Sequence, residues 1–225
     1  MSLLITTSLI DSVNWAKNAP NSPCKDNPEI TWKQKAYNDL KNTLARIYTP
    51  GGFYMERGVR IENTVYKIIE EGKVDTVSCS AHFKKVLDLC NGGVFQRKTK
   101  SFIDIDGQEY CLFGKIDVLF PKKKIIDLKT TGSFGGRDKY LKTLQHKIYC
   151  YNERISDFDY VIMEFESEEN DKLRDVHIIS YKAEDFDSVK ADITKAIRDT
   201  MAFIEAFDEE GDLLDLYMHK FNMYN

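Results

Sequence analysis

The chain has 225 residues, of which 42% are hydrophobic and 30% are charged, and its formal net charge is −4. This composition is typical of a folded globular protein and excludes an intrinsically disordered chain. The net charge excludes a generally basic coat for nucleic acid, although a bound cation and a local lysine patch can still supply a positive field.

The cysteines, the N-terminal residues and the longest apolar runs predict where in the cell the chain is located. No apolar run approaches the roughly 18 residues of a membrane span, and the first residues lack the basic flank and cleavage site of a signal peptide. The cysteines are odd in number and scattered without a Cys-x-x-Cys pair, which predicts free thiols, no zinc site and a cytoplasmic location. They are Cys24, Cys79, Cys90, Cys111 and Cys150.

Helical patterns dominate the first 90 residues. Apolar spacing and capping residues predict helices at about 7–17, 31–48, 54–71 and 82–90, and Pro50-Gly51-Gly52 ends the second of them.

In the third helix an acidic residue stands beside the apolar stripe. Val59, Val65, Ile68 and Ile69 are expected to point inward, and Glu62 falls on the flank of that stripe. Either this glutamate complements the helix N-terminus, or it faces a metal site across a sheet.

Strand patterns follow in series. Residues 94–105, 109–120 and 124–130 predict a three-stranded meander, with a tight hairpin turn at Asp106-Gly107. Asp104 and Asp106 could imitate metal ligands, but turn chemistry explains them better.

The next helix is predicted at about 138–152. Gln145 and Tyr149 are four residues apart, so they project from one helical face, and His146 points to an adjacent face that we expect at the surface. A partly buried amphipathic face is the simpler explanation of this Gln-x-x-x-Tyr spacing.

The last third combines strands with a long helix. Residues 158–166 and 176–182 predict two strands, and their connection to the meander through a helix predicts a mixed sheet. Residues 183–208 predict a long amphipathic helix, and the tail from 213 to 225 either docks as a final helix or mediates association. Without repeats or a clear linker, we expect a single domain over residues 1–225.

The most informative segment is the predicted hairpin from 114 to 131. Asp127 and Lys129 must share one face of their strand, because side chains alternate. Asp117 joins that face if the turn holds three or five residues, but not if it holds four without a bulge. No glycine marks a left-handed turn position, so the sequence leaves these alternatives open.

Two aspartates on one face suggest a metal site. Close carboxylates repel one another unless a cation lies between them, and oxygen ligands favour Mg²⁺. Asp127 and Lys129 could equally form an ion pair on a solvated sheet face. The surrounding apolar run is typical of a buried strand, however, where a charge needs a partner or a function.

Asp117, nine intervening residues and Asp127-Leu128-Lys129 resemble the core motif of the PD-(D/E)XK nuclease superfamily. The stretch 126–131 is especially similar to the RecB-like and phage-type branches, and 58–62 is similar to the first-helix motif of the lambda-exonuclease-like branch. Gln145 and Tyr149 stand where the RecB-like branch carries the same spacing.

The resemblance implies a fold and its boundaries. The expected fold class is α/β: a PD-(D/E)XK restriction-endonuclease-like core at about 54–166, with a central mixed β-sheet flanked by helices. A helical extension would occupy residues 1–53, and a further strand and helices would occupy 167–225.

The resemblance also implies residue roles. Asp117 and Asp127 would bind the metal with Glu62 and the backbone carbonyl of Leu128, and Lys129 would position the attacking water. Asp127 replaces the glutamate of many members, and no histidine near Glu62 supplies the further ligand common in the RecB-like branch. The residues expected to contact nucleic acid or brace the site are Gln145, Tyr149, Thr131, Arg60 and Lys142.

The function implied is that of a magnesium-dependent DNA exonuclease of phage-recombination or RecB-like type. Mn²⁺ is an expected substitute for Mg²⁺, and no iron–sulfur cluster is expected because no cysteine follows Cys150. The implied partners are DNA, a single-strand annealing or recombination protein and further copies of the chain, with no membrane. A restriction- or repair-type endonuclease, a non-cleaving nucleic-acid-binding module and a small metabolic enzyme with the same magnesium cluster are the alternatives.

Overall fold

The computed structural model describes residues 2–25, 27–47, 52–72, 80–167, 170–206 and 212–222. By backbone contacts the chain divides into two compact units. The first unit comprises Met1–Thr49, Lys100–Gly114 and Asp187–Asn225, and the second unit comprises Pro50–Thr99 and Lys115–Phe186. The expected single domain therefore stays a prediction.

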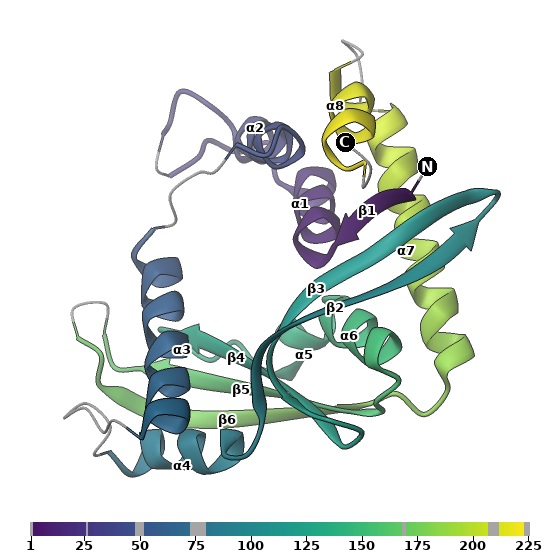
Figure 1. Ribbon diagram of the computed structural model, residues 1–225. Coiled ribbons are helices and arrows are strands. Elements are labelled where there is room, and N and C mark those ends of the chain that lie inside the picture. The colour runs from purple at the N-terminus through teal and green to yellow at the C-terminus, as the bar shows by residue number, and fades with distance from the viewer. Residues whose placement is uncertain are drawn as a thin grey trace. The chain divides into compact units, whose positions relative to one another are not determined.

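The predicted α/β class with a mixed sheet is confirmed (Figure 1). Strand pairing follows the order β1-β3-β4-β5-β6, and β2 also pairs with β3. The strands are β1 (Ser2–Thr6), β2 (Val94–Ile105), β3 (Gln108–Phe120), β4 (Lys124–Thr131), β5 (Asp157–Phe165) and β6 (Leu173–Lys182). The helices are α1 (Thr7–Asn18), α2 (Trp32–Leu44), α3 (Phe53–Glu71), α4 (Ala81–Cys90), α5 (Arg137–Leu141), α6 (Gln145–Glu153), α7 (Phe186–Ala206) and α8 (Asp212–Lys220).

In the second unit a parallel pair of strands, β4 and β5, forms the middle of the sheet. Antiparallel pairing adds β3 to the outer side of β4 and β6 to the outer side of β5. Alternate residues of β4, Ile126 and Leu128, enter the hydrophobic core shared with α3 and α4. Strand alternation therefore turns Asp127 and Lys129 to the opposite face.

Helix α3 packs closely on β4, and its orientation corrects the predicted stripe. A β-carbon at Gly58 would stand 3.3 Å from Thr130 Oγ1, so glycine permits the close approach. Ile61 and Val65 are buried, but Val59 is 54% exposed, so its predicted inward position is wrong. The stripe instead includes Arg57, which is fully buried and donates to the Ser167 carbonyl at 2.9 Å.

In the first unit a short strand precedes α1. β1 pairs in parallel with β3, from Ser2 against Glu109 to Thr6 against Phe113, and the Thr6 side chain then accepts a hydrogen bond from the Leu9 N–H as the helix cap. This strand was not predicted, whereas the helix predicted at about 7–17 corresponds to α1. The tail docks as α8, one of the two predicted outcomes, and Phe221 accepts a hydrogen bond from the Leu4 N–H at 2.7 Å.

The helix predicted at 138–152 is two helices, α5 and α6. Between them Thr143 Oγ1 donates to the Tyr140 carbonyl at 3.0 Å, and this side-chain bond to the backbone competes with helix continuation. His146 is 1% exposed, so its predicted surface position is wrong. Its Nδ1 lies 3.2 Å from Tyr160 Oη, and its ring packs 4.2 Å from that of Tyr181.

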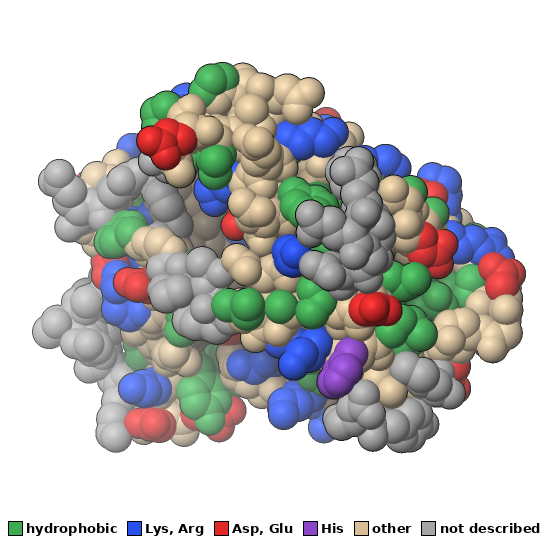
Figure 2. All heavy atoms as spheres, turned by 90° about the horizontal axis from the view of Figure 1, so that it is seen from above, with side chains coloured by type: hydrophobic (Ala, Val, Ile, Leu, Met, Phe, Trp, Pro, Cys, Tyr) green, Lys and Arg blue, Asp and Glu red, His purple; other side chains and the backbone are tan. Residues whose placement is uncertain are grey.

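Charges are mixed on the surface. Figure 2 shows lysine and arginine side chains interspersed with acidic and hydrophobic ones on the face it presents. None of the described helices combines the length and apolarity needed to cross a bilayer. Pro50, Gly51 and Cys79, which entered the sequence predictions, lie outside the described residues.

Candidate active site

The site lies in the second unit, where β3 and β4 cease to pair. Phe120 pairs with Lys124, so the turn holds three residues, and Lys122 supplies its left-handed conformation with φ 61°. This settles the alternatives that the sequence left open, because Asp117 then lies opposite Asp127. The described pairing reaches only Val118, and beyond it the Leu128 N–H donates to Asp117 Oδ2 at 2.8 Å.

Asp127 is held from two sides. Its side chain is buried, with 1% of the residue exposed. Gln145 Nε2 donates to Oδ1 at 2.6 Å, and Lys129 Nζ lies 2.7 Å from Oδ2. Gln145 and Tyr149 share a helical face as predicted, since Gln145 Nε2 also donates to Tyr149 Oη at 3.3 Å. The structure thus brings Gln145 and Lys129 to the same carboxylate.

Glu62 joins this group from α3. Burial raises the pKa of Glu62, nearby Lys115 lowers it, Asp127 raises it, and a hydrogen bond with Asp117 lowers it. Of the two alternatives, a glutamate that complements the helix N-terminus and one that faces the strand residues, the second is favoured, because Glu62 interacts with both aspartates. Its role at a metal stays a prediction.

The carboxylates share an environment that disfavours their charge. Burial raises the pKa of Asp117 well above its ordinary value, and Asp127 and Glu62 raise it further. Burial also raises the pKa of Asp127, against the attraction of Lys129. For Lys129, burial acts to lower the pKa, but the Asp127 carboxylate outweighs it and the pKa is raised. We call Glu62, Asp117 and Asp127 the acidic cluster.

The acidic cluster fits a hard divalent cation by the chemistry of its donors. Carboxylate oxygens are the ligands that Mg²⁺ prefers, and mutual repulsion favours a cation among them. Asp127 Oδ2 is buried and receives no well-oriented hydrogen bond from the described residues beside its ion pair with Lys129. Within the described parts of the chain, no group of three His, Cys, Asp or Glu side chains has the spacing of a complete metal-binding site.

The remaining predicted residues have other contacts. Thr131 Oγ1 donates to the Ser133 carbonyl at 2.8 Å and braces the loop after β4. Arg60 forms a bidentate ion pair with Asp171 at 2.7 and 2.8 Å, rather than with the acidic cluster. Lys142 is exposed at the end of α5. The backbone of Leu128 reaches the cluster through its N–H, and the role of its carbonyl stays a prediction.

One charged neighbour was missed in the sequence. Lys115 precedes Asp117 by two residues on β3 and acts on Glu62 more strongly than any other charged group. Strand alternation, which places residues two apart on one side, was the signal that could have revealed it.

Comparisons with known proteins find likeness in structure. No family model matches the chain, and no curated protein matches it. The crystal structure of SSO0001 is similar with a TM-score of 0.53 and 14% identity, covering 90% of this chain and 77% of that one. This likeness concerns the fold.

Two exonucleases are also among the similar structures. An alkaline exonuclease from Laribacter hongkongensis has a TM-score of 0.47 and 13% identity, covering 93% of this chain and 94% of its own. A phage-related exonuclease from Haemophilus somnus has a TM-score of 0.48 and 13% identity, covering 90% and 94%.

Proposed function

We propose that this chain is a magnesium-dependent nuclease that hydrolyses DNA phosphodiester bonds, most simply as an exonuclease of phage-recombination or RecB-like type. The observation that carries the proposal is the buried acidic cluster with Lys129 ion-paired to Asp127 at 2.7 Å. Buried groups that shift one another's pKa values are typical of catalytic sites. The resemblance of the motif supports the same class.

Asp117, Asp127 and Glu62 would hold the cation, with Mn²⁺ as a substitute for Mg²⁺. A divalent cation at this position supplies Lewis acidity toward a phosphoryl oxygen and toward water. The chain's own residues orient the reacting groups. Gln145 fixes one oxygen of Asp127 through its 2.6 Å hydrogen bond.

Lys129 is the cationic group of the reaction. Asp127 keeps its ammonium charged and fixes its direction, so that it can hydrogen-bond the attacking water and the negative charge that develops on the phosphoryl oxygens. Such preorganised donors typically contribute on the order of 10²–10³ in rate. A ring-forming homo-oligomer and a recombination partner protein belong to the exonuclease hypothesis and remain predictions.

The test compares DNA with and without ends. End-labelled linear DNA and closed circular DNA are incubated with the protein and Mg²⁺, beside the Asp127→Asn variant and an EDTA control. Loss of the linear substrate alone, abolished by the substitution and by EDTA, is the expected result. Cutting of circles would favour an endonuclease. Intact DNA of both forms would overturn the hydrolase assignment in favour of a non-cleaving module.

A further inference from the structure

Lys115 is a second lysine close to the acidic cluster, because its charge lowers the pKa of Glu62. It is exposed on β3, two residues before Asp117, so both side chains leave the strand on one side. Its backbone is fixed, because Tyr149 Oη donates to the Lys115 carbonyl at 3.0 Å. The same tyrosine hydroxyl receives the hydrogen bond from Gln145.

The charges around the cluster act on one another. Lys115 lowers the pKa of Glu62, Lys129 lowers it as well, and Asp127 pairs with Lys129 at 2.7 Å. Two lysines, Lys115 on β3 and Lys129 on β4, therefore act on the acidic cluster. Only one of these two lysines has an ion-pair partner among the described residues. Lys129 Nζ lies 2.7 Å from Asp127, whereas no described carboxylate lies within ion-pair distance of Lys115.

An exposed ammonium next to a cation site suits a phosphate ligand. A metal held by the carboxylates would neutralise much of their charge and leave Lys115 as net positive charge at the rim. Lysine binds phosphate as a compact point charge on a flexible stem. Resting on the proposed function, we infer that Lys115 binds a non-bridging oxygen of a DNA backbone phosphate adjacent to the one being cut.

This role differs from that of Lys129. A contact with a neighbouring phosphate is made equally before and during the reaction, so losing it raises KM and leaves kcat nearly unchanged. Each phosphate contact also contributes about 0.9 to the slope of log affinity against log salt concentration on duplex DNA. Lys115 is thus a binding and positioning residue.

The test uses the full chain with three substitutions. Lys115→Gln removes the charge, Lys115→Arg keeps it, and Lys123→Gln makes the same charge change in the exposed turn between β3 and β4. Degradation of linear DNA in Mg²⁺ gives kcat and KM. Fluorescence anisotropy with the same labelled DNA in Ca²⁺, which also takes carboxylate oxygens as ligands, measures binding at several salt concentrations.

We expect Lys115→Gln to raise KM about tenfold, a loss typical of one charge-assisted contact. Its kcat should change less than threefold, and its salt slope should fall by about 1. Lys115→Arg should restore most of the affinity, and Lys123→Gln should match the wild type. Equal KM and equal salt slopes for Lys115→Gln and Lys123→Gln would overturn the inference.

The two readouts separate this inference from the proposed function. If the wild type leaves DNA intact but Lys115→Gln still loses affinity and salt slope, the hydrolase proposal fails and the phosphate contact stands. If the wild type degrades DNA and Lys115→Gln does so with unchanged KM, the phosphate contact alone fails. If all variants bind DNA with the same affinity and slope, Lys115 makes no phosphate contact.

Discussion

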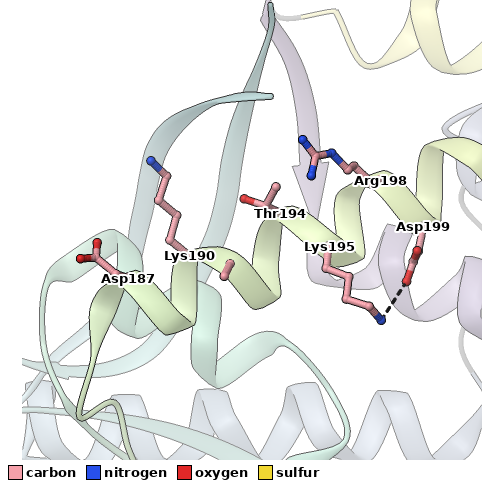
Figure 3. A pocket seen from close by; sticks show the side chains of 7 residues that line it. Asp187, Lys190, Thr194, Lys195, Arg198 and Asp199 are labelled. Carbon is pink, nitrogen blue, oxygen red and sulfur yellow. Dashed lines mark hydrogen bonds and ion pairs between the residues drawn. The ribbon is translucent and has the colours of Figure 1, made fainter. Parts of the chain in front are cut away.

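Two regions of the molecule place opposite charges close together, and they differ in exposure. On the outer face of α7, Lys195 and Asp199 pair at 3.5 Å with side chains 79% and 55% exposed (Figure 3). Arg198 on the same helix forms a bidentate pair with Asp106 at 2.8 and 3.0 Å. Lys195, Arg198 and Asp199 line a groove of about 430 Å³ on α7. In the acidic cluster, by contrast, Asp127 is 1% exposed.

The direction of the pKa shifts shows what exposure changes. Arg198 lowers the pKa of Asp106, because a cation faces that carboxylate in water. For Asp117, burial and the neighbouring carboxylates raise the pKa. A satisfied surface pair needs no further ligand, whereas crowded buried carboxylates are stabilised by a proton or a metal. Closeness of charges alone therefore does not identify a reactive site.

Asp117→Asn tests most directly whether the buried carboxylates differ in function from the exposed pairs. The substitution should lower the activity and raise the stability. We expect the rate of DNA cleavage in Mg²⁺ to fall by about 10²–10³, as for other preorganised electrostatic groups. In EDTA the same variant should be more stable than the wild type. An aspartate whose pKa is raised on folding loses stability as pH rises above its ordinary value through the raised one, and asparagine does not.

Asp106→Asn is the matched control, since it makes the same change in an exposed pair. Its cleavage rate should stay within twofold of the wild type. Thermal unfolding between pH 5 and 8 in EDTA checks the stability, and the advantage of Asp117→Asn should grow with pH. A cleavage rate of Asp117→Asn equal to that of Asp106→Asn would show that burial of the cluster has no catalytic meaning.

His146 shows how burial affects a basic side chain rather than a carboxylate. Burial lowers the pKa of His146 to about 4 from an ordinary value of 6.5. Below pH 6.5 this histidine binds a proton in the unfolded chain but stays neutral in the folded chain. The free energy of unfolding therefore falls from pH 6.5 toward pH 4. The shift of the His146 pKa from 6.5 to about 4 corresponds to a loss of about 3 kcal/mol in the free energy of unfolding over this pH range, at 1.36 kcal/mol per pKa unit.

His146→Gln should remove this part of the pH dependence, whatever it does to stability at pH 7. Urea unfolding at pH 7 and pH 5 measures it, and the stability lost between the two should be smaller in the variant. His82→Gln, at an exposed position, serves as control and should keep the wild-type dependence. Parallel pH profiles for wild type and His146→Gln would contradict the burial of a neutral imidazole.

Strand alternation made the strand of the candidate site predictable, and helix orientation was the harder problem. Asp127 and Lys129 share a face in any extended strand, so their convergence needed no further information. The turn length did need the structure, because Lys122 adopts φ 61° without being glycine. In α3 the buried stripe includes Arg57, whose guanidinium stacks 4.4 Å from the Phe165 ring, and an apolar rule chooses Val59 instead.

Tertiary contacts decided the other failures. His146 looks like a surface residue on a polar helix, yet aromatic side chains of β5 and β6 enclose it. β1 has five residues and runs directly into α1, so it offers no turn signal between strand and helix. Long amphipathic patterns were reliable: the helix predicted at 183–208 corresponds to α7, and Ile193 and Ile197 on its apolar side are buried.

The smallest expected effect comes from the exposed side of the comparison. Lys195→Gln removes an i,i+4 ion pair at 3.5 Å between well-exposed side chains, and such pairs contribute about 0.3 kcal/mol because water and salt screen them. Chemical denaturation should therefore give a free energy of unfolding within 0.5 kcal/mol of the wild type, roughly the limit expected for surface substitutions. DNA affinity and its salt dependence should also be unchanged. A salt slope reduced by about 1 would mean that α7 contacts a phosphate, and an exposed ion pair would then share in the function proposed for the buried cluster.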